Sequence, residues 1–181
     1  MSVTNELLFA GFGGQGILFC GKVAAYAGLV DNREVSWLPS YGPEMRGGTA
    51  NCHVIISESP VGSPIVNNPT ELIVMNLPSF DKFEGTVAAG GNIFIDSSFI
   101  ERDAARSDVN YYKIPATQMA NDLGIPKLAN MIILGKMLAV SGIVSLDTVR
   151  KAIEKCVPPT KTDLIEVNMN AINAGYNYEA L

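Results

Sequence analysis

The sequence predicts an α/β fold, which we expect to be a single-domain, Rossmann-like three-layer sandwich with a largely parallel sheet and a helical C-terminal part. A glycine-rich segment follows an apolar strand near the N-terminus and leads into a helical pattern. Short apolar strands then alternate with helices up to Pro115, and the rest of the chain is helical in pattern. No second glycine-rich linker or internal repeat divides the chain, so we expect one domain over residues 1–181.

The first elements follow from an apolar run and the small residues after it. Glu6–Ala10 is short and apolar, which predicts a buried strand. The helix that begins near Gln15 carries small residues at helical spacing, which would let it lie close to a sheet. The small residues are Gly21, Ala24, Ala25 and Gly28, and the larger Ile17 lies on the same face.

The remaining strands are apolar or β-branched runs bounded by turn residues. They lie at Val35–Leu38, Thr49–Ser57, Leu72–Met75, Asn92–Asp96 and Val109–Ile114. The strands of the first half are expected to be parallel. Helical patterns predict a short helix that starts at Asn76 and runs past Phe83, and four later ones. These four are Thr117–Leu123, Leu128–Ser141, Ser145–Cys156 and Asp163–Ala174, of which the second is apolar nearly all round and should be buried.

The glycine-rich segment has the spacing Gly-x-Gly-x-x-Gly in the strand, turn and helix context that a phosphate site requires. Glycines let backbone N–H groups approach an anion, and the helix N-terminus adds partial positive charge. The alternative is that the glycines serve only a tight turn and close helix packing. The candidate ligand-facing residues here are Gly11, Phe12, Gly13, Gly14, Gln15 and Gly16.

An ordinary NAD site is disfavoured by the second strand. Such a site needs an acidic side chain at the end of that strand to bind the ribose. Asp31 and Glu34 lie before the strand, and its end at Pro39-Ser40 is neutral. A free-standing NAD(P)-binding or nucleotide-binding module therefore stays an alternative only.

A second unusual segment follows the second strand. It is too rich in glycine and proline for regular structure, yet it carries an aromatic ring, an acid and a guanidinium within six residues. Loops of this kind at strand ends often bind ligands, although an Arg46–Glu44 pair on a solvated loop is the alternative. The candidate binding residues here are Ser40, Tyr41, Gly42, Pro43, Glu44, Met45, Arg46, Gly47 and Gly48.

Composition restricts the partners of the chain. Apolar residues make up 48% of the sequence and charged residues only 17%, with mean hydropathy +0.20, so we expect a partner to cover part of the surface. The net charge of -5 and the lack of a basic cluster argue against nucleic acid. The N-terminus lacks signal-peptide features and no apolar run is long enough to span a membrane, so we expect a cytoplasmic protein that does not bind membranes.

The inventory of reactive side chains predicts no catalysis by this chain alone. Cys20, Cys52 and Cys156 are scattered and lack the spacing of an iron–sulfur ligand set. His53 is the only histidine, and without a nearby acid or nucleophile we interpret it as structural. No metal-ligand cluster or paired carboxylates can be assembled from the sequence.

Four motifs together resemble the gamma subunit of 2-oxoacid:ferredoxin (acceptor) oxidoreductases over almost the whole chain. They are GFGGQG at 11–16, SYGPEMRGG at 40–48, LANMIILG at 128–135 and NMNAINAGY at 168–176. The resemblance is closest to the 2-oxoglutarate type, because pyruvate-type subunits generally carry Arg at the position of Phe12 and a different loop at Gly42–Gly48. Branched-chain and indolepyruvate enzymes stay open.

The resemblance implies a heteromeric complex that converts a 2-oxoacid to an acyl-coenzyme A. Partner subunits would hold thiamine diphosphate, magnesium and iron–sulfur clusters, and ferredoxin or flavodoxin would accept the electrons. The gamma subunit would lie beside the thiamine site, where the two candidate loops would form one rim. This rim would either bind the phosphates of coenzyme A or dock on the catalytic subunits; a purely structural subunit is a further alternative.

Overall fold

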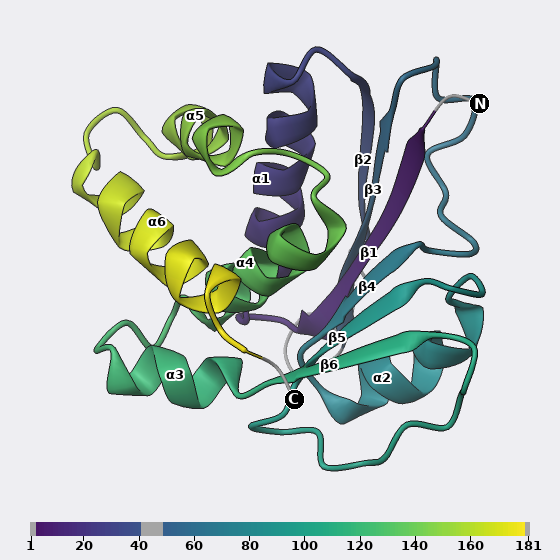
Figure 1. The fold of residues 1–181 in the computed structure, drawn as a ribbon. Coiled ribbons are helices and arrows are strands. Elements are labelled where there is room, and N and C mark those ends of the chain that lie inside the picture. Colours follow the sequence, from purple (N-terminus) through teal and green to yellow (C-terminus); the bar gives the residue numbers. More distant parts are fainter. Residues whose placement is uncertain (1–2, 41–48, 180–181) are drawn as a thin grey trace.

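The six strands found in the described part of the chain belong to one mixed sheet with the strand order β2-β3-β1-β4-β5-β6 (Figure 1). The computed structural model describes residues 3–40 and 49–179. Strands β1, β4, β5 and β6 are parallel to one another, whereas β3 is antiparallel to both of its neighbours, β1 and β2. The strands are β1 (Thr4–Phe12), β2 (Glu34–Ser40), β3 (Thr49–Ser57), β4 (Glu71–Val74), β5 (Asn92–Asp96) and β6 (Asn110–Ile114).

The expectation that the first half of the sheet is parallel is wrong. Only residues 41–48 join β2 to β3. A parallel crossover needs a dozen residues or more, whereas a short connection returns the chain antiparallel beside the strand it has just left. As a result, β3 separates β2 from β1, and β2 is an edge strand. Five of the six strands still point the same way, so the sheet is largely parallel.

The predicted helices all form, with ends that differ by a few residues from the sequence patterns. Asn76 begins the helix after β4 by accepting a hydrogen bond through Oδ1 from the N–H of Ser79, and Ser145 caps a later helix in the same way through Thr148. The helices are α1 (Ile17–Val30), α2 (Leu77–Phe83), α3 (Ala116–Asp122), α4 (Ala129–Ser141), α5 (Leu146–Cys156) and α6 (Asp163–Tyr176).

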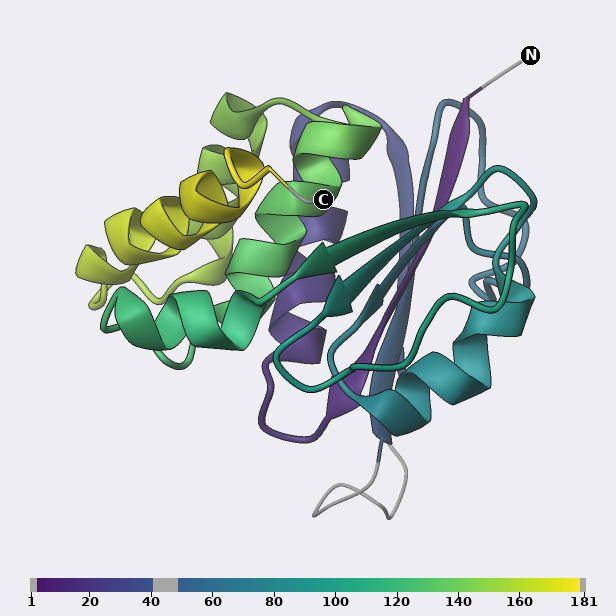
Figure 2. The ribbon, with the colours of Figure 1, turned by 60° about the horizontal axis from the view of Figure 1, so that its bottom comes forward.

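The helices cover the two faces of the sheet unequally. In β1, Leu7 and Phe9 point into the core beneath α1 and α4, and Leu8 and Ala10 point into the smaller core beneath α2. Helices α5 and α6 pack outside α1 and α4, respectively. Figures 1 and 2 show α2 alone on its face, opposite the group formed by α1, α4, α5 and α6. The first core is therefore much larger than the second.

Glycines set the contact between α4 and α6. A Cβ at Gly135 of α4 would overlap the carbonyl group of Ile172, and one at Gly175 of α6 would overlap the carbonyl group of Ile132. The two helix backbones therefore touch directly.

Within residues 3–40 and 49–179, none of the helices has the length and hydropathy that a membrane crossing requires.

Candidate functional site

The candidate site lies at the edge of the sheet where the parallel strands end. After β1 the chain enters α1 on one face, and after the neighbouring β4 it enters α2 on the opposite face. Helices that leave adjacent parallel strands to opposite faces open a crevice between those strands, which is where α/β proteins commonly bind ligands. Figure 2 shows the turn after β1 and the start of α2 at this edge.

The turn after β1 needs its glycines for two reasons. Gly14 and Gly16 have φ angles of +98° and +74°, a region that side chains disfavour. A Cβ at Gly11 would lie 2.7 Å from Oε1 of Gln15, so Gly11 leaves room for that side chain. Gly13 completes the turn. The sequence motif therefore forms the predicted turn, with Gly16 at the start of α1.

Gln15 connects the ends of β1 and β4 across the crevice. Its Oε1 accepts a hydrogen bond from the N–H of Phe12 at 2.6 Å, and its Nε2 donates to the carbonyl oxygen of Met75 at 3.0 Å. The side chain thus lies inside the glycine turn and uses one of the turn's N–H groups. The sequence identified Gln15 as a site residue but gave no signal of this bridging role.

Asn130 holds the turn from the other side. It is 2% exposed, and its Nδ2 donates a hydrogen bond to the carbonyl oxygen of Gly16 at 2.9 Å. Its Oδ1 is buried and has no partner among the described residues. Asn130 was not among the predicted site residues, although one amide in an otherwise apolar helical run is a signal that could have identified it.

A cavity of about 230 Å³ lies beside the turn. Gln15 and Lys127 bring side-chain donors to it, and Thr117 also lines it; no acidic residue is among the lining residues that the structure describes. The remaining lining residues are Gly14, Met75, Phe99, Pro126 and Ala129. The cavity therefore suits an anionic group with an apolar neighbour.

Thr117 is positioned by a buried carboxylate at the end of β5. Asp96 is fully buried and accepts hydrogen bonds from the hydroxyl and the N–H of Thr117, at 2.6 and 3.3 Å. It also accepts from the N–H of Ser98 at 3.1 Å. Asp96 therefore fixes the start of α3 against the sheet and is committed to this structural role.

The second candidate loop begins and ends at the same edge. Ser40 is the last residue of β2, and β3 begins at Thr49, which is paired with Phe12 of β1. The ends of the loop are thereby placed beside the glycine turn, as one rim would require. The predicted site residues Tyr41, Gly42, Pro43, Glu44, Met45, Arg46, Gly47 and Gly48 lie outside the described residues.

Large apolar side chains are exposed at the ends of three adjacent strands. Phe12 at the end of β1, Leu77 after β4 and Phe99 after β5 are 38%, 40% and 56% exposed. Exposed apolar groups that gather at one edge are typical of a surface that a partner covers. We call Phe12, Leu77 and Phe99 the apolar rim.

The sheet order further argues against an ordinary dinucleotide site. The acidic ribose ligand belongs at the end of a strand adjacent to β1. Here the neighbours of β1 are β3 and β4, and β2 ends at the neutral Ser40. Gln15 also occupies the inside of the turn.

The remaining reactive side chains have structural roles. His53 accepts a hydrogen bond through Nδ1 from the N–H of Val66, which holds the connection after β3 and agrees with the structural interpretation. Burial lowers the pKa of His53 and raises the pKa of Cys52 to about 12. Among the residues that the structure describes, no three His, Cys, Asp or Glu side chains cluster as metal ligands would.

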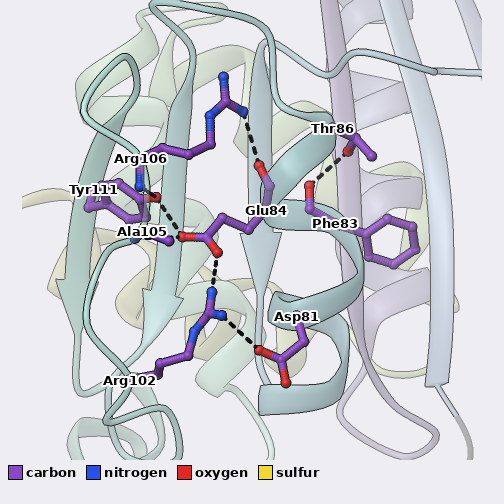
Figure 3. A network of polar contacts seen from close by, with 8 residues as sticks. All are labelled: Asp81, Phe83, Glu84, Thr86, Arg102, Ala105, Arg106 and Tyr111. Atoms are coloured by element: carbon purple, nitrogen blue, oxygen red, sulfur yellow. Dashed lines mark hydrogen bonds and ion pairs between the residues drawn. The ribbon is translucent and has the colours of Figure 1, made fainter.

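A polar network on the face that carries α2 is centred on Glu84 (Figure 3). Glu84 accepts hydrogen bonds from the hydroxyl of Tyr111 at 2.6 Å and the N–H of Ala105 at 3.1 Å, and pairs with the guanidinium of Arg102. Arg106 donates to the carbonyl oxygen of Glu84 at 3.1 Å. These contacts fix the connection between β5 and β6 against the end of α2.

Comparison with known proteins gives the family. A model described as pyruvate ferredoxin/flavodoxin oxidoreductase matches residues 6–178. The chain is similar to the 2-oxoglutarate synthase subunit KorC of Methanocaldococcus jannaschii, with 35% identity over 97% of this chain and 94% of that protein. It is 41% identical to the ketoisovalerate oxidoreductase subunit VorA of Methanothermobacter thermautotrophicus over 92% of this chain. The chain spans about a third of the length of that ketoisovalerate relative, 34%.

Solved structures share the fold. The gamma subunit of a keto/oxoacid ferredoxin oxidoreductase from Geobacter sulfurreducens superposes with a TM-score of 0.81 at 29% identity, over 95% of this chain and 96% of that one. A 2-oxoglutarate:ferredoxin oxidoreductase from Magnetococcus marinus, with 2-oxoglutarate, coenzyme A and succinyl-CoA bound, gives a TM-score of 0.86 at 21% identity, over 96% of this chain and 30% of that one. With the family match over nearly its whole length, the chain belongs to the pyruvate ferredoxin/flavodoxin oxidoreductase family.

Proposed function

We propose that the chain is the gamma subunit of a heteromeric, thiamine-diphosphate-dependent 2-oxoacid:ferredoxin oxidoreductase, which converts a 2-oxoacid to an acyl-coenzyme A. The observation that carries this proposal is the nearly end-to-end correspondence with a 2-oxoglutarate synthase subunit. Ketoisovalerate and 2-oxoglutarate relatives are similar to the chain to a comparable degree, so both 2-oxoacids are candidates. The chain would act as one domain of the complex.

The partners would supply the chemistry that this chain does not. Thiamine diphosphate with magnesium would stabilise the carbanion left by decarboxylation, and iron–sulfur clusters would pass the electrons to ferredoxin or flavodoxin. The three free cysteines suit a reducing compartment, and we place the complex in the cytoplasm. The residues of this chain would bind and orient coenzyme A and would exclude water from the site.

The rim at the carboxyl ends of the strands is where we place coenzyme A. Its phosphates suit a turn with positive-φ glycines at the start of α1, where no side chain of the described residues caps the helix. The side chain of Lys127 adds a charged donor at the adjacent cavity. Arg46 would complete the phosphate site from the second loop.

Docking on the catalytic subunits is the second candidate role of the same edge. The observation that favours it is the apolar rim, because phosphate binding gives no reason to expose Phe12, Leu77 and Phe99. The two roles are compatible if coenzyme A binds where the subunits meet. The two roles predict different effects of losing the guanidinium of Arg46: a weaker affinity for coenzyme A in one case and loss of assembly in the other.

The experiment compares Arg46→Ala with Arg150→Ala in the assembled complex. Arg150 lies on α5, on a different part of the surface, so its loss controls for net charge. A raised KM for coenzyme A with intact assembly in Arg46→Ala alone supports the phosphate role. Dissociation of the complex supports docking, and unchanged kinetics and assembly contradict both roles for Arg46.

A further inference from the structure

Asn130 is a buried amide whose place in the fold is not explained by core packing. It is 2% exposed and lies in α4, where the next four residues, Met131–Leu134, are buried and apolar. Its Oδ1 has no hydrogen-bond partner within residues 3–40 and 49–179. A buried acceptor without a donor lowers stability, and leucine has the same branched shape without that loss. The feature that an amide provides here is the hydrogen bond made by Nδ2.

That hydrogen bond fixes one carbonyl group at the start of α1. Nδ2 of Asn130 donates to the carbonyl oxygen of Gly16 at 2.9 Å, and the same oxygen accepts from the N–H of Cys20 at 3.0 Å. Gly16 has a φ angle of +74° and directly precedes Ile17, the first residue of the helix. Two donors therefore hold the orientation of this peptide group, one from α1 itself and one from α4.

The orientation of the Gly16 carbonyl group also sets the orientation of a donor. A peptide group is planar and trans, so the C=O of Gly16 and the N–H of Ile17 point in opposite directions. The carbonyl points along α1 toward Cys20, which directs the N–H of Ile17 out of the start of the helix. N–H groups at this position have no partner within their own helix and are free to bind an anion.

Asn130 also holds together two segments that form the cavity beside the turn. A Cβ at Gly16 would lie 2.5 Å from Nδ2 of Asn130, so the amide packs directly against the turn. The turn supplies Gly14 and Gln15 to the lining of the cavity, and the segment just before Asn130 supplies Lys127. The contact between Asn130 and Gly16 therefore fixes the glycine turn relative to a charged donor.

We infer that Asn130 is a positioning residue for coenzyme A. Through the carbonyl group of Gly16 it orients the N–H of Ile17, and it holds the turn in place beside Lys127. The inference rests on the proposed function, because it needs a phosphate of coenzyme A at the turn. Asn130 is buried and acts only through these groups, so its loss should weaken the binding of coenzyme A and leave the reaction of the 2-oxoacid unchanged.

The test replaces each of two buried amides by leucine in the assembled complex. Asn168 of α6 is the matched control, because it is 4% exposed and its Nδ2 also donates to a backbone carbonyl, that of Leu164, at 2.7 Å. Its Oδ1 likewise has no partner in the described part of the chain. The two amides differ in the carbonyl that they hold, since Leu164 lies in the same helix as Asn168 and Gly16 lies in the turn.

Asn130→Leu should raise the KM for coenzyme A about tenfold, because a misdirected N–H loses a charge-assisted hydrogen bond to phosphate. Its kcat and its KM for the 2-oxoacid should stay at the parent values. Asn168→Leu should leave all three values unchanged. Asn130→Ala removes the same donor without the bulk of leucine and should raise the KM for coenzyme A in the same way; a rise confined to Asn130→Leu would overturn the inference.

Comparison with Arg46→Ala separates a failure of this inference from a failure of the proposed phosphate role. If Arg46→Ala raises the KM for coenzyme A and neither Asn130 variant does, the phosphate role stands and the positioning role is wrong. If none of these variants raises it, both roles are wrong. Equal rises in Asn130→Leu and Asn168→Leu, or dissociation of the complex in both Asn130 variants, would overturn the inference by assigning Asn130 to packing or assembly.

Discussion

Nε2 of Gln15 donates a hydrogen bond to the carbonyl oxygen of Met75 at 3.0 Å, and this contact joins the ends of two parallel strands that send their helices to opposite faces of the sheet. The same side chain accepts from the N–H of Phe12 at 2.6 Å. One glutamine thus sets the shape of the crevice where the fold would place a ligand. The glycines around it make room for this amide as well as for the turn.

Gln15→Ala should destabilise the chain by about 2 kcal/mol, because it removes both hydrogen bonds and leaves the carbonyl oxygen of Met75 without its donor. Urea unfolding measures the change. Gln118→Ala is the matched control, since among the described residues the side chain of Gln118 bonds only to Asp122 of its own helix, and it should stay within about 0.5 kcal/mol of the parent. Equal effects in the two variants would contradict the bridging role.

Gly175→Ala should lower the free energy of unfolding by about 3 kcal/mol, because the new methyl group would overlap the carbonyl group of Ile132 and push α6 away from α4. Thermal unfolding detects the loss. Gly62→Ala is the control, because a Cβ at Gly62 meets no atom within 4 Å, and its effect should be near zero. A Gly175→Ala variant as stable as the parent would show that the helices are not in backbone contact.

Glu71 makes the stability depend on pH near neutrality. Burial raises its pKa to about 7 from 4.5, although two hydrogen bonds from Asn92, each 3.1 Å, favour the charged form. A raised pKa in the folded state means that the stabilisation is complete below pH 4.5 and is lost as the pH rises through 7. Protonation of this one carboxyl therefore favours folding.

Glu71→Gln should remove this dependence. Relative to the parent, the variant should gain about 2 kcal/mol of stability between about pH 5 and about pH 9, because glutamine is neutral throughout. Urea unfolding at the two pH values measures the gain. A constant difference between variant and parent would contradict the buried, protonated carboxyl.

Glu84 should show the opposite dependence. Burial raises its pKa, but the donors Tyr111, Ala105 and Arg102 outweigh burial and hold it below the ordinary 4.5. A lowered pKa gives stabilisation that is present above 4.5 and is lost as the pH falls through the lower, folded-state value.

Glu84→Gln should therefore cost about 2 kcal/mol at neutral pH, from lost charge-assisted hydrogen bonds, and less in acid. Unfolding curves at both pH values measure this. Asp81→Asn removes another partner of Arg102, one that is 52% exposed, and should cost far less. If the two substitutions cost the same at neutral pH, the network is not centred on Glu84.

Local sequence patterns predicted the helices and strands well, because each of these elements has its own signal in the sequence. A few residues of sequence are enough to recognise the glycines that take positive φ, the cap Ser145 and the apolar run of α4. The direction of β3 was missed because it depends on how a short connection turns, which strand composition does not encode. The length of that connection was the available clue.

The candidate site residues stay a prediction, and the contacts that hold the glycine turn were not predicted from the sequence. The motif located Gly11–Gly16, yet the bridge from Gln15 to Met75 and the bond from Asn130 to Gly16 join residues 60 and 114 positions apart. Such contacts arise only when the sheet assembles, so no local pattern carries them.

The most direct test of the central claim is purification of the full chain, with an affinity tag, from its native cells, followed by assay of 2-oxoacid-dependent and coenzyme A-dependent ferredoxin reduction. We predict that subunits with thiamine diphosphate and iron–sulfur clusters will co-purify, and that this assembly will be active while the chain alone is not. Turnover of a 2-oxoacid by the isolated chain, or tightly bound NAD in its glycine turn, would contradict the account.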